Sequence, residues 1–274
     1  MNRKGITLIE LLVALTISGI MVAGVYRTFI SQQHTYTVQE QVVDMQQNVR
    51  LAINRMTREL RMAGYGKMDA NFFSHGGMTV GSDTFSNVVI PGGDDHSVTI
   101  VAGYQTLIQT TMSLNATTGS NSIFLNDVSG FDTGVKQYIS INGLESHRIV
   151  AIVGKELQFP GWDKLTNDHQ AGEPVYLVMA ITYSIGPFEG KSCLLRDDHL
   201  GAGPQPVAEN IDNLQFAYLD SNGNPTADPN LIRMIQVSII ARTDKTDSEL
   251  AKAGDGFRRR TLTTNIQLRN LAFL

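Results

Sequence analysis

The first sixty residues separate into an apolar half and an amphipathic half. Residues 6–30 carry only two charged side chains, Glu10 and Arg27, and they follow the basic residues Arg3 and Lys4. An apolar segment of about 20 residues is long enough to cross a bilayer. Basic residues in front of such a segment place the N-terminus in the cytoplasm and the bulk of the chain on the other side. The pattern therefore predicts one transmembrane helix over residues 6–30.

The same helix is predicted to continue as an amphipathic segment over residues 31–66. No proline or glycine occurs between residues 31 and 63, and the apolar residues recur at steps of three and four, which is one face of an α-helix. Gly64 and Gly66 end it. A helix over residues 6–63 would span roughly 87 Å at 1.5 Å per residue. The apolar face consists of Val38, Val42, Met45, Val49, Ala52, Met56, Leu60 and Ala63.

Beyond Gly66 the chain consists of short β-rich runs separated by glycine, asparagine and aspartate, which is typical of strands and turns. No helical crossover separates the runs, so the sheet is predicted to be antiparallel. The expected strands are residues 87–90, 97–104, 122–125, 137–141, 148–153, 156–159, 174–185, 193–196, 214–219, 232–241 and 259–268.

The spacing of these strands changes between residues 104 and 175. Short strands there are linked by tight turns such as Asn142-Gly143 and Pro160-Gly161. We interpret residues 104–175 as a small β-module inserted into a head formed by residues 67–103 and 176–274. The predicted fold is therefore α+β: a long N-terminal helix, half transmembrane and half amphipathic, packed on an antiparallel β head.

The composition of the chain excludes fewer classes of function than the pattern of apolar and polar residues does. The chain has 274 residues, of which 42% are hydrophobic, so it can bury a substantial core. Its formal net charge of −4 gives no overall electrostatic signature for nucleic acid. The single cysteine, Cys193, excludes an internal disulfide framework, and its apolar neighbours predict a buried, inert thiol.

Glu10 is the residue that an ordinary membrane anchor does not explain. A charge in the middle of a spanning helix costs about 2.5–3.5 kcal/mol and less near its ends, so an intramembrane carboxylate indicates a function and a partner. A secretory signal peptide with a cut near Gly24 is an alternative. Neither the carboxylate nor the uninterrupted helical pattern beyond Gly24 fits it.

The sequence Lys4-Gly5-Ile6-Thr7-Leu8-Ile9-Glu10-Leu11-Leu12-Val13-Ala14 resembles the class III signal of type IV prepilins and pseudopilins. The resemblance implies that residues 1–5 are a leader, cleaved after Gly5 by the prepilin peptidase, and that Ile6 becomes the N-methylated terminus. It also implies that Glu10, then the fifth residue, pairs with the N-terminal amine of a neighbouring subunit. Ile6 departs from the phenylalanine usual at that position.

A second, more degenerate resemblance is to PilW-like minor pilins, with the pseudopilin GspJ sharing much of the layout. It rests on residues 55–65, 207–220, 235–238 and 259–270. It implies a subunit of the bacterial inner membrane, with its C-terminal domain in the periplasm, that enters a type IV pilus and so serves motility or adhesion. The implied partners are the prepilin peptidase, other minor and major pilins and the inner-membrane assembly platform.

Two other functions remain open at this point. A GspJ-like pseudopilin would assemble through the same helix packing and charge pairing, but in a type II secretion system. A pilus-tip adhesin or a DNA-uptake protein would instead bind a ligand through the inserted β-module. Salt-dependent DNA binding would favour that second alternative.

No motif for catalysis, a cofactor or a metal is evident, so the chain is expected not to be an enzyme. The triplets Asp94-Asp95-His96 and Asp197-Asp198-His199 could bind a divalent ion together, but each lies in turn-like sequence, and solvated loops are the simpler interpretation. Asp220-Ser221-Asn222-Gly223-Asn224 fits a hairpin turn better than a calcium loop. The arginines at 50, 55, 58, 61 and 258–260 are expected on solvated faces or edges.

Overall fold

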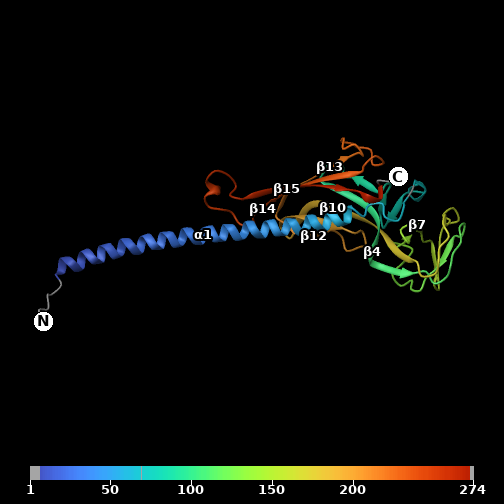
Figure 1. The fold of residues 1–274 in the computed structure, drawn as a ribbon, viewed down its shortest axis with the longest axis horizontal. Helices are drawn as coiled ribbons and strands as arrows, with labels where there is room; N and C mark the ends of the chain where they lie inside the picture. Colours follow the sequence, from blue (N-terminus) through green and yellow to red (C-terminus); the bar gives the residue numbers. More distant parts are fainter. Residues whose placement is uncertain (1–6, 69, 272–274) are drawn as a thin grey trace. The chain divides into compact units, whose positions relative to one another are not determined.

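The computed structural model describes residues 7–68 and 70–271, which form two compact units. Residues up to 47 together with 243–258 make the first unit, and residues 48–242 together with 259 onward make the second. Helix α1 (Leu8–Leu60) begins in the first unit and ends in the second (Figure 1). It is unbroken through Gly19 and Gly24, the two glycines of its apolar half.

The C-terminal part of α1 is held in the second unit by the apolar face that the sequence predicts. In the second unit, Val49, Ala52, Met56 and Leu60 are buried, Met56 and Leu60 completely. Arg50, Asn54 and Arg58 on the opposite side are exposed. Burying each large apolar side chain contributes about 1.5–3 kcal/mol, so this face anchors the helix in the second unit.

The end of α1 is tied to the sheet by its two glycines. Gly64 and Gly66 have φ angles of 78° and 110°, which only glycine adopts without strain. The turn that they permit lets the N–H of Gly64 donate to the carbonyl of Val101, and the N–H of Gly103 donate to the carbonyl of Tyr65.

The main sheet of the second unit has seven antiparallel strands. Five of its strands follow the order β12 (Gln205–Glu209), β11 (Lys191–Asp197), β10 (Pro174–Phe188), β4 (Ser97–Thr111), β3 (Val89–Pro91). The long strands β10 and β4 form the central pair. The hairpin of β6 (Tyr138–Ile141) and β7 (Glu145–Arg148) joins through pairing of β6 with β10. Cys193 is a free thiol buried in β11, as predicted.

A second antiparallel sheet consists of β13 (Ile211–Leu219), β14 (Met234–Arg242) and β15 (Arg259–Gln267), in that order. Its β14–β15 connection, residues 243–258 with the 3-10 helix η1 (Leu250–Lys252), belongs to the first unit. There Asp247 is buried and accepts two hydrogen bonds from the Arg258 guanidinium, at 3.1 and 2.7 Å, and His34 of α1 lies 3.5 Å away.

The remaining elements are short. A third sheet has the order β5 (Ser122–Phe124), β9 (Glu156–Gln158), β8 (Ala151–Val153). Helix α2 (Ala70–Ser74), the ribbon of β1 (Met78–Val80) and β2 (Asp83–Phe85), and the 3-10 helix η2 (Arg269–Leu271) complete the chain.

The α+β prediction with antiparallel sheets is confirmed, and most strands were expected. The expected strand at residues 148–153 is correct only for β8, which begins at Ala151; its first residue, Arg148, is instead the last residue of β7, whose other residues were not predicted. Between them Ile149 donates its N–H to Gln137, whereas Val150 donates to Gln158 of the other sheet. The chain passes from one sheet to the next there, which a run of apolar residues does not reveal. The short elements β1, β2, β12 and α2 were not predicted.

The segment between β4 and β10 contains β5–β9, in part as a sheet of its own and in part paired with β10. Its independence as an inserted module, and the boundaries at residues 104 and 175, stay predictions.

Candidate functional site: the N-terminal helix and the buried ionic clusters

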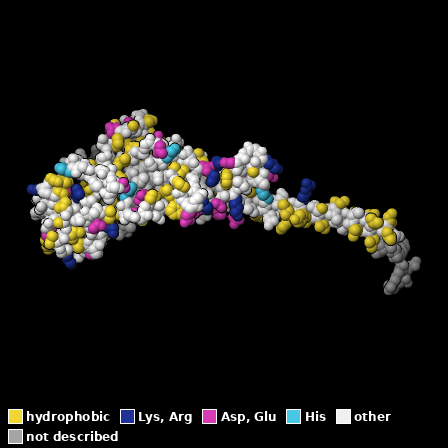
Figure 2. Space-filling model, turned by 180° about the vertical axis from the view of Figure 1, so that it is seen from behind, with side chains coloured by type: hydrophobic (Ala, Val, Ile, Leu, Met, Phe, Trp, Pro, Cys, Tyr) yellow, Lys and Arg dark blue, Asp and Glu magenta, His cyan; other side chains and the backbone are white. Residues whose placement is uncertain are grey.

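The first part of α1 presents an apolar surface that nothing in the described chain covers. An 18-residue stretch of this helix has a mean hydropathy of 2.3, and by length and composition the helix could cross a membrane. Leu8, Leu15, Ile20 and Val25 are each 70% or more exposed. Figure 2 shows groups of hydrophobic side chains, in yellow, along the exposed part of the helix. Such a surface in water is unfavourable, so it indicates a lipid or protein environment.

Glu10 takes part in a capping box at the start of this helix. Thr7 precedes the first helical residue, and its hydroxyl lies 3.4 Å from the Glu10 N–H. In return, Glu10 Oε2 accepts the N–H and the hydroxyl of Thr7, each at 2.9 Å. The two residues thus satisfy each other's polar groups at a helix end, as the spacing Thr-x-x-Glu permits. Sequence reasoning overlooked this signature, although it is visible in the chain.

The other carboxylate oxygen, Glu10 Oε1, has no hydrogen-bond partner among the described residues. Glu10 also has no cationic partner in that part of the chain. Gly5 and Ile6, the predicted cleavage and methylation positions, lie outside the described residues, so their roles stay predictions.

A second carboxylate of α1, Glu59, is used inside the chain. Arg196 of β11 donates from Nε to both Glu59 oxygens, at 3.2 and 2.9 Å, and the Tyr183 hydroxyl of β10 donates to Oε2 at 2.8 Å. Burial, reinforced by the Glu59 charge, holds the pKa of Tyr183 well above its usual range. The sequence did not single out Glu59; the structure places it against the sheet, where it fixes α1 to β10 and β11. The arginines at 50, 55, 58 and 61 are exposed, as expected.

The most concentrated set of buried ionisable groups was not predicted. Five side chains from β7 and the segment after β9 alternate between acid and imidazole, in the order Asp163, His147, Glu145, His169, Glu173. His147 Nδ1 lies 2.7 Å from Asp163 Oδ1, and His169 bridges Glu145 and Glu173 at 2.6 and 2.7 Å. His147 Nε2 lies 3.3 Å from Glu145 Oε2, which is an ion-pair contact but not an aligned hydrogen bond, and this contact links the two halves of the series. We call this set the acid–imidazole chain.

The environment favours the charged forms of His147, His169 and Glu145. Burial by itself lowers the pKa of His147, but its contacts with Asp163 and Glu145 raise that pKa to about 9. The pKa of His169 is likewise raised by Glu145 and Glu173 against the effect of burial. Burial raises the pKa of Glu145, and its contacts with His147, His169 and Thr166 more than reverse this and hold it well below its usual range. Both imidazoles therefore favour protonation between the acidic residues that flank them.

The acid–imidazole chain is not arranged as a metal site. Its members follow one another in a line, and within residues 7–68 and 70–271 no three or more His, Cys, Asp or Glu side chains are placed to hold a metal ion.

The two Asp-Asp-His triplets are held by local contacts of their own. His96 Nδ1 lies 2.6 Å from the carbonyl oxygen of Leu214. His199 lies between Thr182 Oγ1, at 2.8 Å, and Asp83 Oδ2, at 3.0 Å. Asp220 accepts the N–H groups of Asn222 and Asn224, each at 2.8 Å, so it closes a turn, as predicted.

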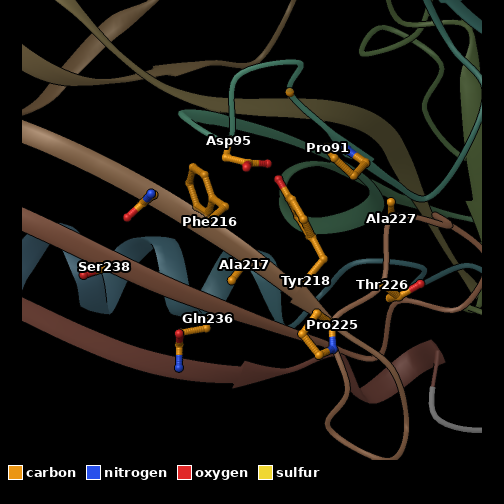
Figure 3. Close-up of a pocket in the computed structure, with 12 residues that line it drawn as sticks. Pro91, Asp95, Phe216, Ala217, Tyr218, Pro225, Thr226, Ala227, Gln236 and Ser238 are labelled. Atoms are coloured by element: carbon orange, nitrogen blue, oxygen red, sulfur yellow. The ribbon is translucent and has the colours of Figure 1, made fainter.

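A cavity of about 680 Å³ lies beside β13 and β14, bounded by the Pro91–Asp95 turn and the Pro225–Ala227 segment (Figure 3). Its ionisable lining groups are Asp95 and Tyr218, and the Tyr218 hydroxyl donates to the Ser97 carbonyl at 3.1 Å. Burial, with Asp95 nearby, raises the pKa of Tyr218. These two groups make no nucleophile–base pair.

Comparison with known proteins gives information about the N-terminal part of the chain. Residues 1–26 match the model of the prokaryotic N-terminal methylation motif. Among solved structures, a type IV-like pilin of Thermus thermophilus is similar to 82% of this chain and 97% of its own, with 11% identity and a TM-score of 0.35. No curated protein sequence shows significant similarity to the chain.

The N-terminus therefore carries the methylation motif of type IV prepilins. Together with the apolar helix that follows it, the motif supports a pilin- or pseudopilin-like subunit that is anchored in a membrane and contacts other pilins.

Proposed function

We propose that the chain is a minor pilin, a structural subunit that helps to initiate, cap or regulate a type IV pilus. The observation that carries the proposal is the uncovered apolar start of α1 with Glu10 as its one carboxylate. Before assembly this helix lies in the inner membrane, with the β-rich part in the periplasm. During assembly it packs against the helices of neighbouring pilins.

Glu10 supplies the electrostatic part of this assembly. The prepilin peptidase removes residues 1–5, and the new amine of Ile6 is methylated but keeps its positive charge. A carboxylate and an ammonium ion, each costly alone in hydrocarbon, neutralise one another when two subunits are in register. Oε2 of Glu10 is engaged by Thr7, whereas Oε1 is available for a neighbour's amine.

Mass spectrometry of the mature protein tests the processing step. The expected mass corresponds to a chain beginning at Ile6 with one methyl group on its amine. A mature protein that retains Met1, or one cut near Gly24, would refute the prepilin assignment.

Substitutions at residues 7 and 10 separate the charge of Glu10 from its role as a helix cap. Glu10→Gln keeps an oxygen for the capping box and loses the charge, Glu10→Leu loses both, and Thr7→Val loses the capping hydroxyl but keeps the charge. All three should insert into the membrane; the Glu10 variants should impair piliation, and Thr7→Val should not. If Glu10→Gln piliates normally while Glu10→Leu fails, Glu10 acts as a cap and the charge pairing is wrong.

A further inference from the structure

A cavity of about 350 Å³ opens beside the acid–imidazole chain, within the second unit. It lies in the size range of small-ligand sites, about 300–1,000 Å³. Lys67 and His75 line it from the segment after α1, and Trp162 and Lys164 line it from the segment after β9.

The acids at this cavity are already engaged by the protein. Both oxygens of Glu145 accept hydrogen bonds, from Thr166, Asn167 and His169. Asp163 accepts from His147 through one oxygen and from the N–H of Arg148 through the other. These two carboxylates therefore leave little acceptor capacity for a ligand.

The groups that remain available are donors. Lys67 and Lys164 are exposed, and neither has an ion-pair partner within the described chain. His147 also lines the cavity, but its Nε2 is buried and lies 3.3 Å from Glu145 Oε2, so the exposed donors are the two lysines. Ammonium groups donate and cannot accept, so the complementary ligand is an acceptor with negative charge.

Two stacked aromatic rings line one part of the cavity. The His75 and Trp162 rings are stacked with centroids 3.8 Å apart and an angle of 6° between their planes. Trp162 is nevertheless 46% exposed, so a large part of the indole is available to a ligand. An exposed tryptophan offers both apolar area and an N–H donor, as is common in binding sites.

We propose that this cavity binds an oxyanion, a carboxylate or phosphate group carried by a small ligand. Lys67 and Lys164 supply the charge and Trp162 the contact surface. This inference goes beyond the assembly role and does not depend on it, because it concerns the β-rich part of the chain alone.

The test uses the fluorescence of full-length protein in detergent, because Trp162 is the only tryptophan in the chain. The probes are inorganic phosphate, glucuronate and, as the uncharged counterpart of glucuronate, glucose, with sodium chloride at matched ionic strength. Saturable changes with phosphate, glucuronate or both are expected, and none with glucose or chloride. A response to phosphate alone identifies a phosphate-bearing ligand, and a response to glucuronate alone a carboxylate-bearing one.

Charge-removing variants localise the binding. Lys67→Met and Lys164→Met should each raise the Kd of the responding anion at least tenfold, because each removes a direct charged contact. Lys155→Met, at the turn between β8 and β9, should leave it unchanged. The substituted lysines are exposed, so thermal unfolding should match that of the parent protein. No saturable response to either anion, or the same Kd in all three variants, would overturn the proposal.

Discussion

Raising the pH should destabilise the β-rich part of the chain through His147 and His169. Both imidazoles lie between carboxylates, and their side chains are 3% and 0% exposed. A histidine whose pKa is higher in the folded than in the unfolded state stabilises the fold as long as it is protonated. That stabilisation is complete below the unfolded pKa of 6.5 and disappears as the pH rises through the folded pKa, about 9 for His147.

The size of the effect follows from the shift. The pKa of His147 rises from 6.5 to about 9, and each pKa unit corresponds to about 1.4 kcal/mol, so the free energy of unfolding should fall by about 3 kcal/mol across this window. His169 adds a contribution of the same sign. The lowered pKa of Glu145 acts in the opposite sense, because its stabilisation is present above 4.5 and lost in acid. Stability is therefore expected to be greatest between about pH 4.5 and 6.5.

Urea unfolding of the full-length protein in detergent, measured from pH 5 to 10, checks this expectation. Trp162 is adjacent to Asp163, so its fluorescence reports on the segment that the acid–imidazole chain holds in place. His147→Gln should be less stable at pH 6 and should lose much of the pH dependence between 6.5 and 9. A free energy of unfolding that is constant across this range, or an undiminished slope in the variant, would refute the reasoning.

Three further predictions concern the packing of α1 and the β6–β7 hairpin, each measured by chemical unfolding. Arg196→Met should cost about 3 kcal/mol, because Glu59 is left without its main cationic partner, and Glu59→Leu in the same chain should recover part of this. Met56→Ala should cost about 2–5 kcal/mol through the cavity at a completely buried site. Gly143→Ala should cost at least about 1–2 kcal/mol, since φ is +72° and a Cβ would lie 2.6 Å from the Tyr65 ring.

Features fixed by residues close together in the chain could be predicted from the sequence. The face of α1 around Met56 follows from a repeat of three and four residues, and β10 and β14 follow from long β-branched runs. The positive φ angles of Asn142 and Gly143 bear out the turn expected there. In each case the signal lies within one element.

Features made by distant residues could not be predicted in this way. Arg196 is 137 positions from Glu59, so a periodic pattern shows only an acid on a helix. Glu145 and His147 lie in β7, whereas His169 follows β8, β9 and a loop, and single ionisable residues in β-rich sequence do not indicate such a contact. The strands β1 and β2, of three residues each, carry too little pattern to be recognised.

Two of the carboxylates of α1, Glu59 and Glu10, differ in the partners that the described chain provides for them. Glu59 lies near the sheet, where desolvation is costly, and the chain provides it with a guanidinium and a hydroxyl. Glu10 lies in a far more apolar stretch, yet within the described residues it receives only the neutral donors of Thr7. If the same chain supplied a cation next to Glu10, pairing with a neighbouring subunit would add little electrostatic attraction. The described chain supplies no such cation, so the Glu10 carboxylate can attract a positive charge from a second subunit. This attraction is strongest where lipid excludes water.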